Sequence, residues 1–123
     1  VSLPVIRTAA ASLGARTVCA AAVDWRKRHE IRPHLVTDGE ALNAVLRFAD
    51  AFRVLVEPAC GAALAPLFQQ SAILKDFKEI LVVVCGGNHV SLELLTHWQH
   101  LVLSPKQRGN PANTTAMAGP APG

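Results

Sequence analysis

Apolar and polar residues alternate in the middle of the chain in a way that predicts an amphipathic helix. Four apolar side chains recur at the i, i+3, i+4 and i+7 spacing of one helical face: Leu42, Val45, Leu46 and Ala49. Thr37 and Glu40 precede this face with the spacing of a capping box, in which each side chain bonds the backbone N–H of the other residue. We therefore predict a helix that begins just after Thr37.

Other segments carry weaker helical patterns. Residues 5–13 and 25–30 are candidates for short helices. Residues 60–70 form a longer candidate, which Pro66 would kink because its ring clashes with the preceding turn. Ser91 is a natural N-cap for a final helix, and three apolar residues would lie along one side of it: Leu92, Leu95 and Trp98.

Runs of apolar residues predict strands at residues 17–21, 53–57 and 80–84. The last run is branched and apolar throughout, which favours burial on both faces, as in a parallel sheet. Helices that alternate with such strands are typical of a layered fold. The predicted fold class is therefore α/β, a layered and mostly parallel sheet with flanking helices, and the 123 residues suffice for one domain.

Composition predicts a packed domain over residues 1–103 and a tail after it. Hydrophobic residues make up 50% of the chain and charged residues 17%, a balance that favours burial over disorder. Residues 104–123 are rich in Pro, Gly, Ala, Asn and Thr and lack apolar periodicity, so we expect a disordered tail there. The longest apolar run is too short to cross a bilayer, and no membrane partner is expected.

The net charge and the cysteines bear on nucleic-acid binding and on the cellular compartment. The net charge of +3 is mildly basic and does not by itself indicate nucleic-acid binding. The three cysteines are widely spaced, and no Cys-x-x-Cys pair occurs. No segment has the pattern of a secretory signal. These features favour a reduced, cytoplasmic protein.

The turn Cys85-Gly86-Gly87-Asn88 joins the last predicted strand to the last predicted helix. In open α/β sheets, ligands bind beyond the carboxyl ends of strands. Glycines allow a backbone to approach a ligand closely, and the N–H groups at the start of a helix attract anions. The turn therefore favours a ligand site such as a phosphate site, and an ordinary tight turn is the alternative.

A second motif, Val-Glu-Pro-Ala-Cys-Gly over residues 56–61, places the carboxylate of Glu57 at the end of another predicted strand. The small residues after Glu57 would allow either close packing or the close approach of a flat ligand. The alternative is that Glu57 is a solvated strand-end residue and that the small residues pack against the sheet.

These two motifs resemble those of a known enzyme family. VEPACGAAL at residues 56–64 and VVVCGGN at residues 82–88, in this order, look like motifs of the vertebrate-type L-serine dehydratases and their serine dehydratase-like relatives. Residues 3–18 are similar to the family's preceding stretch, so the resemblance covers about residues 3–101. It implies the C-terminal part of a fold-type II, tryptophan-synthase-β-like domain that binds pyridoxal phosphate between two α/β domains.

The resemblance also implies roles for particular residues near the cofactor. Cys85 corresponds to a cysteine that hydrogen-bonds the pyridine nitrogen. A neutral thiol is a weak partner, which suits β-elimination better than transamination. Gly86 and Gly87 would let the backbone pass close to the ring, and Glu57 corresponds to a glutamate of the active-site region.

Further positions concern a cation and the catalytic lysine. Leu13 and Ala15 correspond to residues whose backbone carbonyls bind a monovalent cation such as K+. The family's usual valine is replaced by Ala15, and this change retains the carbonyl. The family's Schiff-base lysine and its glycine-rich phosphate loop have no match among the 123 residues. We therefore expect no catalytic residue in this piece, and no activity from it alone.

The activity that the resemblance implies, for a longer chain that contains this piece, is that of an ammonia-lyase. It would act on L-serine and L-threonine by β-elimination and release a 2-oxo acid and ammonia, and the family suggests a homodimer. The alternative is a catalytically inactive product that acts through protein–protein interaction. A third hypothesis is another reaction of the same fold group, such as serine racemisation or cysteine desulfhydration.

Three weaker signals have plain structural interpretations. His97 and His100 stand three residues apart but have no further metal ligand nearby in sequence, so we interpret them as surface or interfacial residues. The basic residues of segment 26–32 lack interleaved aromatics and are interpreted as a solvated helix face. His89 follows the glycine turn, and we expect it to have a structural role.

Overall fold

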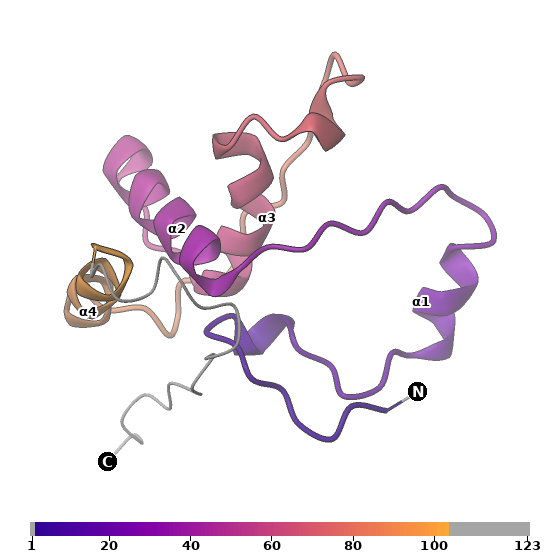
Figure 1. Cartoon of the computed structure of the whole chain (residues 1–123), viewed down its shortest axis with the longest axis horizontal. Coiled ribbons are helices and arrows are strands. Elements are labelled where there is room, and N and C mark those ends of the chain that lie inside the picture. The colour runs from indigo at the N-terminus through magenta and orange to yellow at the C-terminus, as the bar shows by residue number, and fades with distance from the viewer. Residues whose placement is uncertain (1, 104–123) are drawn as a thin grey trace.

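The computed structural model describes residues 2–103, which fold into helices joined by long connections (Figure 1). The α-helices are α1 Ala20–Trp25, α2 Asp38–Phe52, α3 Pro58–Phe68 and α4 Leu92–Leu103, and two 3-10 turns are η1 Ala11–Leu13 and η2 Ala72–Leu74. Figure 1 shows α1 at the end of an excursion away from α2, α3 and α4. None of the helices described is long and apolar enough to cross a membrane. The predicted tail, residues 104–123, lies outside the described residues.

The start of α2 confirms the predicted capping box. Thr37 Oγ1 accepts a hydrogen bond from the Glu40 N–H at 3.3 Å, and the Thr37 N–H donates to Glu40 Oε2 at 2.7 Å. Two backbone N–H groups at the helix start are thereby satisfied. The helix ends at Phe52, and the C-cap residue Arg53 adopts a left-handed conformation with a φ of 59°.

Helix α3 lies close to the position predicted for it and packs tightly on α2. Pro58 occupies the first turn, where its missing N–H costs nothing. Pro66 lies inside the helix, which ends soon after it at Phe68. A Cβ on Gly61 would stand only 2.2 Å from the Ala41 carbonyl oxygen, so a glycine is required where the two helices meet.

The hydrophobic core lies between α2, α3 and α4. Its buried side chains include Leu42, Val45, Phe48, Val56, Cys60, Leu64 and Trp98. Ser91 caps α4 as predicted, because its hydroxyl accepts a hydrogen bond from the Leu94 N–H at 3.1 Å. Of the apolar side predicted for α4, Leu95 and Trp98 pack toward the core, whereas Leu92 in the first turn is exposed.

The structure assigns no strand to residues 53–57 or 80–84, or to any other part of the described chain. A strand is defined by the ladder that it forms with a neighbour, and β-propensity alone does not supply one. The end of the first segment meets the turn that follows the second, because the Glu57 N–H donates to the Gly86 carbonyl oxygen at 3.1 Å. The predicted parallel sheet is therefore not confirmed by the described residues.

The N-terminal third differs most from the sequence predictions. The helix predicted at residues 5–13 is reduced to η1, and the strand predicted at 17–21 overlaps the first residues of α1. The helix predicted at 25–30 lies earlier in the chain, because α1 ends at Trp25. Neither η1 nor α1 contains a buried residue, so packing in the core does not hold these elements as it holds α2 and α3.

Candidate functional site

Three segments that are distant in sequence meet at Glu57, the N-cap residue of α3. Its N–H donates to the carbonyl oxygen of Gly86 at 3.1 Å, which ties α3 to the glycine turn. Its carboxylate accepts a hydrogen bond from Ser12 Oγ in η1, with 2.9 Å between Ser12 Oγ and Glu57 Oε2. The structure thus brings Glu57 to the predicted turn and adds Ser12, which the sequence patterns had not indicated.

The two glycines of the turn are required by the close approach of residues 55–57. Gly86 has a φ of +77°, a conformation that L side chains rarely adopt, and a Cβ there would stand 3.2 Å from Glu57 Cδ. A Cβ on Gly87 would stand 2.7 Å from the Leu55 carbonyl oxygen. In this structure the two glycines accommodate a close approach of the chain itself, and the predicted approach to a ligand stays a prediction.

A buried thiol lies beneath the turn. Cys60, in the first half of α3, is 3% exposed, and burial is the main cause that raises the pKa of its thiol. A hydrogen bond from the Cys85 backbone to the Cys60 sulfur partly offsets this rise. The side chain of Cys85 is exposed, as a residue that contacts a ligand must be. Cys60 is part of the motif at residues 56–61, but the motif alone assigned no role to its thiol.

The two predicted carbonyl ligands of a cation lie in and just after η1. Leu13 is the last residue of η1, and Ala15 follows Gly14 on the surface. The hydrogen bond from Ser12 to Glu57 holds this segment next to the N-terminus of α3. Cation binding at these positions stays a prediction.

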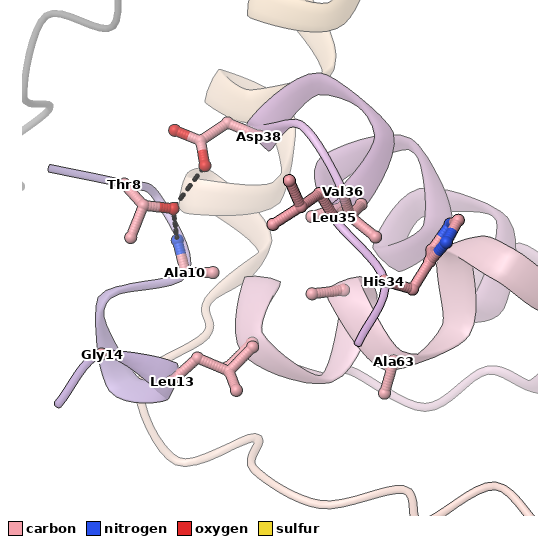
Figure 2. Close-up of a pocket in the computed structure, with 12 residues that line it drawn as sticks. Thr8, Ala10, Leu13, Gly14, His34, Leu35, Val36, Asp38 and Ala63 are labelled. Atoms are coloured by element: carbon pink, nitrogen blue, oxygen red, sulfur yellow. Dashed lines mark hydrogen bonds between the residues drawn. The ribbon is translucent and has the colours of Figure 1, made fainter. Parts of the chain in front are cut away.

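A hollow of about 420 Å³ lies between η1 and the N-terminal parts of α2 and α3 (Figure 2). At its edge, Thr8 Oγ1 donates to Asp38, and the Ala9 N–H donates to Asp38 Oδ2 at 2.9 Å. Leu13 points into the space between η1 and α3 in Figure 2. The hollow is lined mainly by apolar side chains and does not include the Cys85–Gly87 turn, so it adjoins the predicted cation segment rather than the predicted cofactor contacts.

The weaker sequence signals are not brought together into a site. Residues 2–103 contain no group of three or more His, Cys, Asp or Glu side chains that could hold a metal ion. In the basic segment, the Arg28 guanidinium lies 5.7 Å from the centre of the Trp25 ring, and the His29 ring stacks on the same Trp25 at 5.1 Å. His89 is exposed beside the turn.

The residues present fit one end of pyridoxal phosphate. The exposed Cys85 can hydrogen-bond a ring nitrogen. Gly86 and Gly87 carry no side chains, and the positions that a Cβ would take there are met by Glu57 and by the Leu55 carbonyl oxygen. Glu57 holds the turn through its N–H bond to the Gly86 carbonyl oxygen. The glycine-rich loop expected from the family resemblance has no match within residues 2–103.

Comparison with known proteins agrees with these features. Residues 1–86 match the family described as "Pyridoxal-phosphate dependent enzyme". Mouse "Serine dehydratase-like" is 42% identical over 77% of this chain and 31% of its own length. The Dictyostelium discoideum "L-serine dehydratase" is 46% identical over 66% of this chain and 24% of its own. Human "L-serine dehydratase/L-threonine deaminase" is 38% identical over 77% of this chain and 31% of its own length.

A solved structure shows the same likeness in three dimensions. The crystal structure of a fungal L-serine ammonia-lyase from Rhizomucor miehei superposes with a TM-score of 0.69 at 28% identity, over 80% of this chain and 33% of that one. The chain spans about a third or less of the length of the relatives that it matches. Because the family match covers well over half of its residues, the chain belongs to the pyridoxal-phosphate-dependent enzymes.

Proposed function

We propose that this chain is part of a longer pyridoxal-phosphate-dependent ammonia-lyase that converts L-serine and L-threonine to a 2-oxo acid and ammonia. The names of the relatives and of the fungal structure support the substrates and the reaction. The main observation in this chain is the contact between Glu57 and the Cys85–Gly87 turn, which we call the Glu57 joint. It holds the turn against the start of α3 and leaves Cys85 exposed.

The residues of the chain would serve one end of the cofactor. When bound, pyridoxal phosphate supplies the electron sink that makes loss of the α-proton and the β-hydroxyl feasible. The neutral thiol of Cys85 would hydrogen-bond the pyridine nitrogen without holding a proton on it. Gly86 and Gly87 would admit the ring, and Glu57 would keep the turn in place. The lysine that anchors the cofactor would come from another part of the longer chain.

A cation, a second subunit and the cellular location belong to the same proposal. The carbonyls of Leu13 and Ala15 would bind a monovalent cation such as K+, in a segment that Ser12 fixes to α3. The longer enzyme would be a homodimer in the cytoplasm. The free thiols of Cys19, Cys60 and Cys85 support the location, because disulfides are rare in the reducing cytosol.

The layered parallel sheet is also proposed for the longer chain. Leu81 is 91% exposed and Val83 is 69% exposed, although both stand in a run with the composition of a buried strand. Between them, Val82 is partly buried and packs against the core. A neighbouring strand and a covering layer from the rest of the chain would bury the exposed side chains and complete the ladder.

The proposal is tested on the longer chain by replacing Cys85. Purified enzyme is expected to release ammonia and a 2-oxo acid from L-serine. Cys85→Ala is expected to shift the absorption spectrum of the bound cofactor and to lower turnover, because the partner of the ring nitrogen is lost. Cys19→Ala, which removes an exposed thiol in another segment, is the matched control. Unchanged spectrum and turnover in Cys85→Ala would remove the role assigned to Cys85.

A second candidate function is that of an inactive product that acts by binding another protein. The exposed apolar side chains of segment 80–84 favour it, since such surface is usually covered. The intact mass of the endogenous protein separates the two candidates. A species far heavier than 13.1 kDa, with a cofactor that borohydride fixes to a lysine, supports the enzyme. A species near 13.1 kDa without cofactor supports the binding product.

A further inference from the structure

The hydroxyl of Ser12 connects η1 with the N-terminus of α3. Ser12 Oγ donates to Glu57 Oε2 at 2.9 Å, between residues 45 positions apart in sequence. Ser12 immediately precedes Leu13, the first of the two predicted carbonyl ligands of the cation. Its side chain therefore lies between the predicted cation segment and the carboxylate that supports the glycine turn.

The same carboxylate lies against Gly86. A Cβ on Gly86 would stand 3.2 Å from Glu57 Cδ and 3.4 Å from each of the two carboxylate oxygens. The carboxylate is thus fitted to the bare Cα of a glycine with a φ of +77°. A glutamate side chain has several rotamers available, and a hydrogen bond at one oxygen selects among them.

We propose that Ser12 is a positioning residue, whose hydroxyl fixes the Glu57 carboxylate against Gly86 and so holds the turn that presents Cys85. Without this hydroxyl, the carboxylate can leave Gly86, and the turn retains the backbone hydrogen bond from Glu57 as its link to the start of α3. The role of the turn in presenting Cys85 to a cofactor rests on the proposed function. The contacts that hold the turn are independent of that function.

Cys60 provides a reporter of the state of the turn. Its thiol is buried, and the backbone of Cys85 hydrogen-bonds its sulfur. An alkylating reagent reaches such a thiol only when the structure around it opens, so the alkylation rate rises when the turn or the adjoining core opens more often. Cys19 is exposed in another segment and serves as an internal standard for reagent activity.

The experiment compares iodoacetamide labelling of the unmodified chain with that of three variants: Ser12→Ala, Ser12→Thr and Thr17→Ala. Trypsin cleaves after Lys and Arg and separates the three cysteines into the peptides 17–26, 54–75 and 79–106, which mass spectrometry quantifies. Thr17→Ala is the matched control, because Thr17 Oγ1 donates at 2.8 Å to Ser2 Oγ in the same N-terminal region and makes no bond to Glu57.

Ser12→Ala is expected to raise the Cys60 rate by about threefold to tenfold, as loss of one hydrogen bond implies, while the Cys19 rate is unchanged. Ser12→Thr restores the hydroxyl and should return the Cys60 rate to that of the unmodified chain. Equal Cys60 rates in Ser12→Ala and Thr17→Ala, or no rescue by threonine, would overturn the positioning role. The assay contains no cofactor or substrate. Its outcome therefore tests the positioning role of Ser12 separately from the proposed enzyme activity.

Discussion

Gly61 shows how a single missing side chain sets the spacing of two helices. The Ala41 carbonyl oxygen and the Val45 side chain would stand 2.2 Å and 2.7 Å from a Cβ at this position. The carbonyl is part of the α2 backbone and cannot turn away as a flexible side chain could. A methyl group at residue 61 would therefore force α2 and α3 apart.

We predict that Gly61→Ala lowers the free energy of unfolding by about 2–3 kcal/mol, the cost of overpacking a tight core. Gly39→Ala in α2 is the matched control, because nothing lies within 4 Å of a Cβ there. In this control, the free energy of unfolding should rise by about 0.5–1 kcal/mol, because alanine has a better helix propensity than glycine. Urea unfolding followed by circular dichroism measures both, and a Gly61→Ala variant as stable as the unmodified chain would contradict the close helix contact.

Glu40 gives the stability of α2 a predictable dependence on pH. The Thr37 backbone N–H, and then the Thr37 hydroxyl, lower the pKa of the Glu40 carboxyl below its ordinary value. A lowered pKa means that the folded state binds the proton less readily than the unfolded state does. The stabilisation is therefore complete above the ordinary pKa of a glutamate and is lost as the pH falls through the lowered pKa.

The prediction is tested with urea midpoints measured at intervals between about pH 6 and about pH 3, the range around an ordinary glutamate pKa. The difference in stability between the unmodified chain and Glu40→Gln should shrink as the pH falls, because both then carry a neutral group at residue 40. A difference that stays constant over this range would show that the carboxylate makes no contribution to the cap.

At the scale of elements, Trp98 attaches α4 to the rest of the core. Its side chain is 8% exposed, whereas Leu92 in the first turn of the same helix is 72% exposed. Trp98→Ala should lower the free energy of unfolding by about 3–5 kcal/mol, because a large cavity opens between α4 and α2. Leu92→Ala should change it by less than about 0.5 kcal/mol. Thermal unfolding compares the two, and similar losses in both variants would count against this packing.

The sequence indicated the elements that local chemistry determines. Thr37 with Glu40 marked the start of α2, and Ser91 marked the start of α4, because a capping side chain bonds the backbone only a few residues away. Pro66 was expected to kink a helix over residues 60–70, and α3 instead runs over Pro58–Phe68 with Pro66 inside it. These signals need no partner from elsewhere in the chain.

The strands could not be predicted in the same way, because a strand exists only when another segment pairs with it. Residues 80–84 have a strand-like composition, but no strand is assigned to them within residues 2–103, where Val82 packs against the core and the following turn meets Glu57. At the candidate site, Glu57, Cys85 and the two glycines were indicated by a family resemblance. Ser12 and Cys60 became visible only when the fold brought them to the same place.

For the whole molecule, the uncovered apolar run predicts self-association. We expect the 123-residue chain to form oligomers that dissociate when Leu81→Glu and Val83→Glu are introduced together, because charge at such positions blocks edge pairing. Sedimentation velocity measures the change. Leu35→Glu is the control, since Leu35 is 94% exposed but lies in the connection before α2. A monodisperse monomer before any substitution would contradict this prediction.

The Glu57 joint, together with the hydrogen bond from Ser12 to Glu57, also affects the order of folding. Helices α2 and α3 follow each other closely in sequence and can pair early, whereas the bond from Ser12 to Glu57 must close a loop of 45 residues. Closing such a loop costs chain entropy before any contact repays it. The joint should therefore form after the rate-limiting step, so that substitutions in it speed unfolding and leave the folding rate nearly unchanged. The lifetime of the site, more than its rate of assembly, would then depend on Ser12.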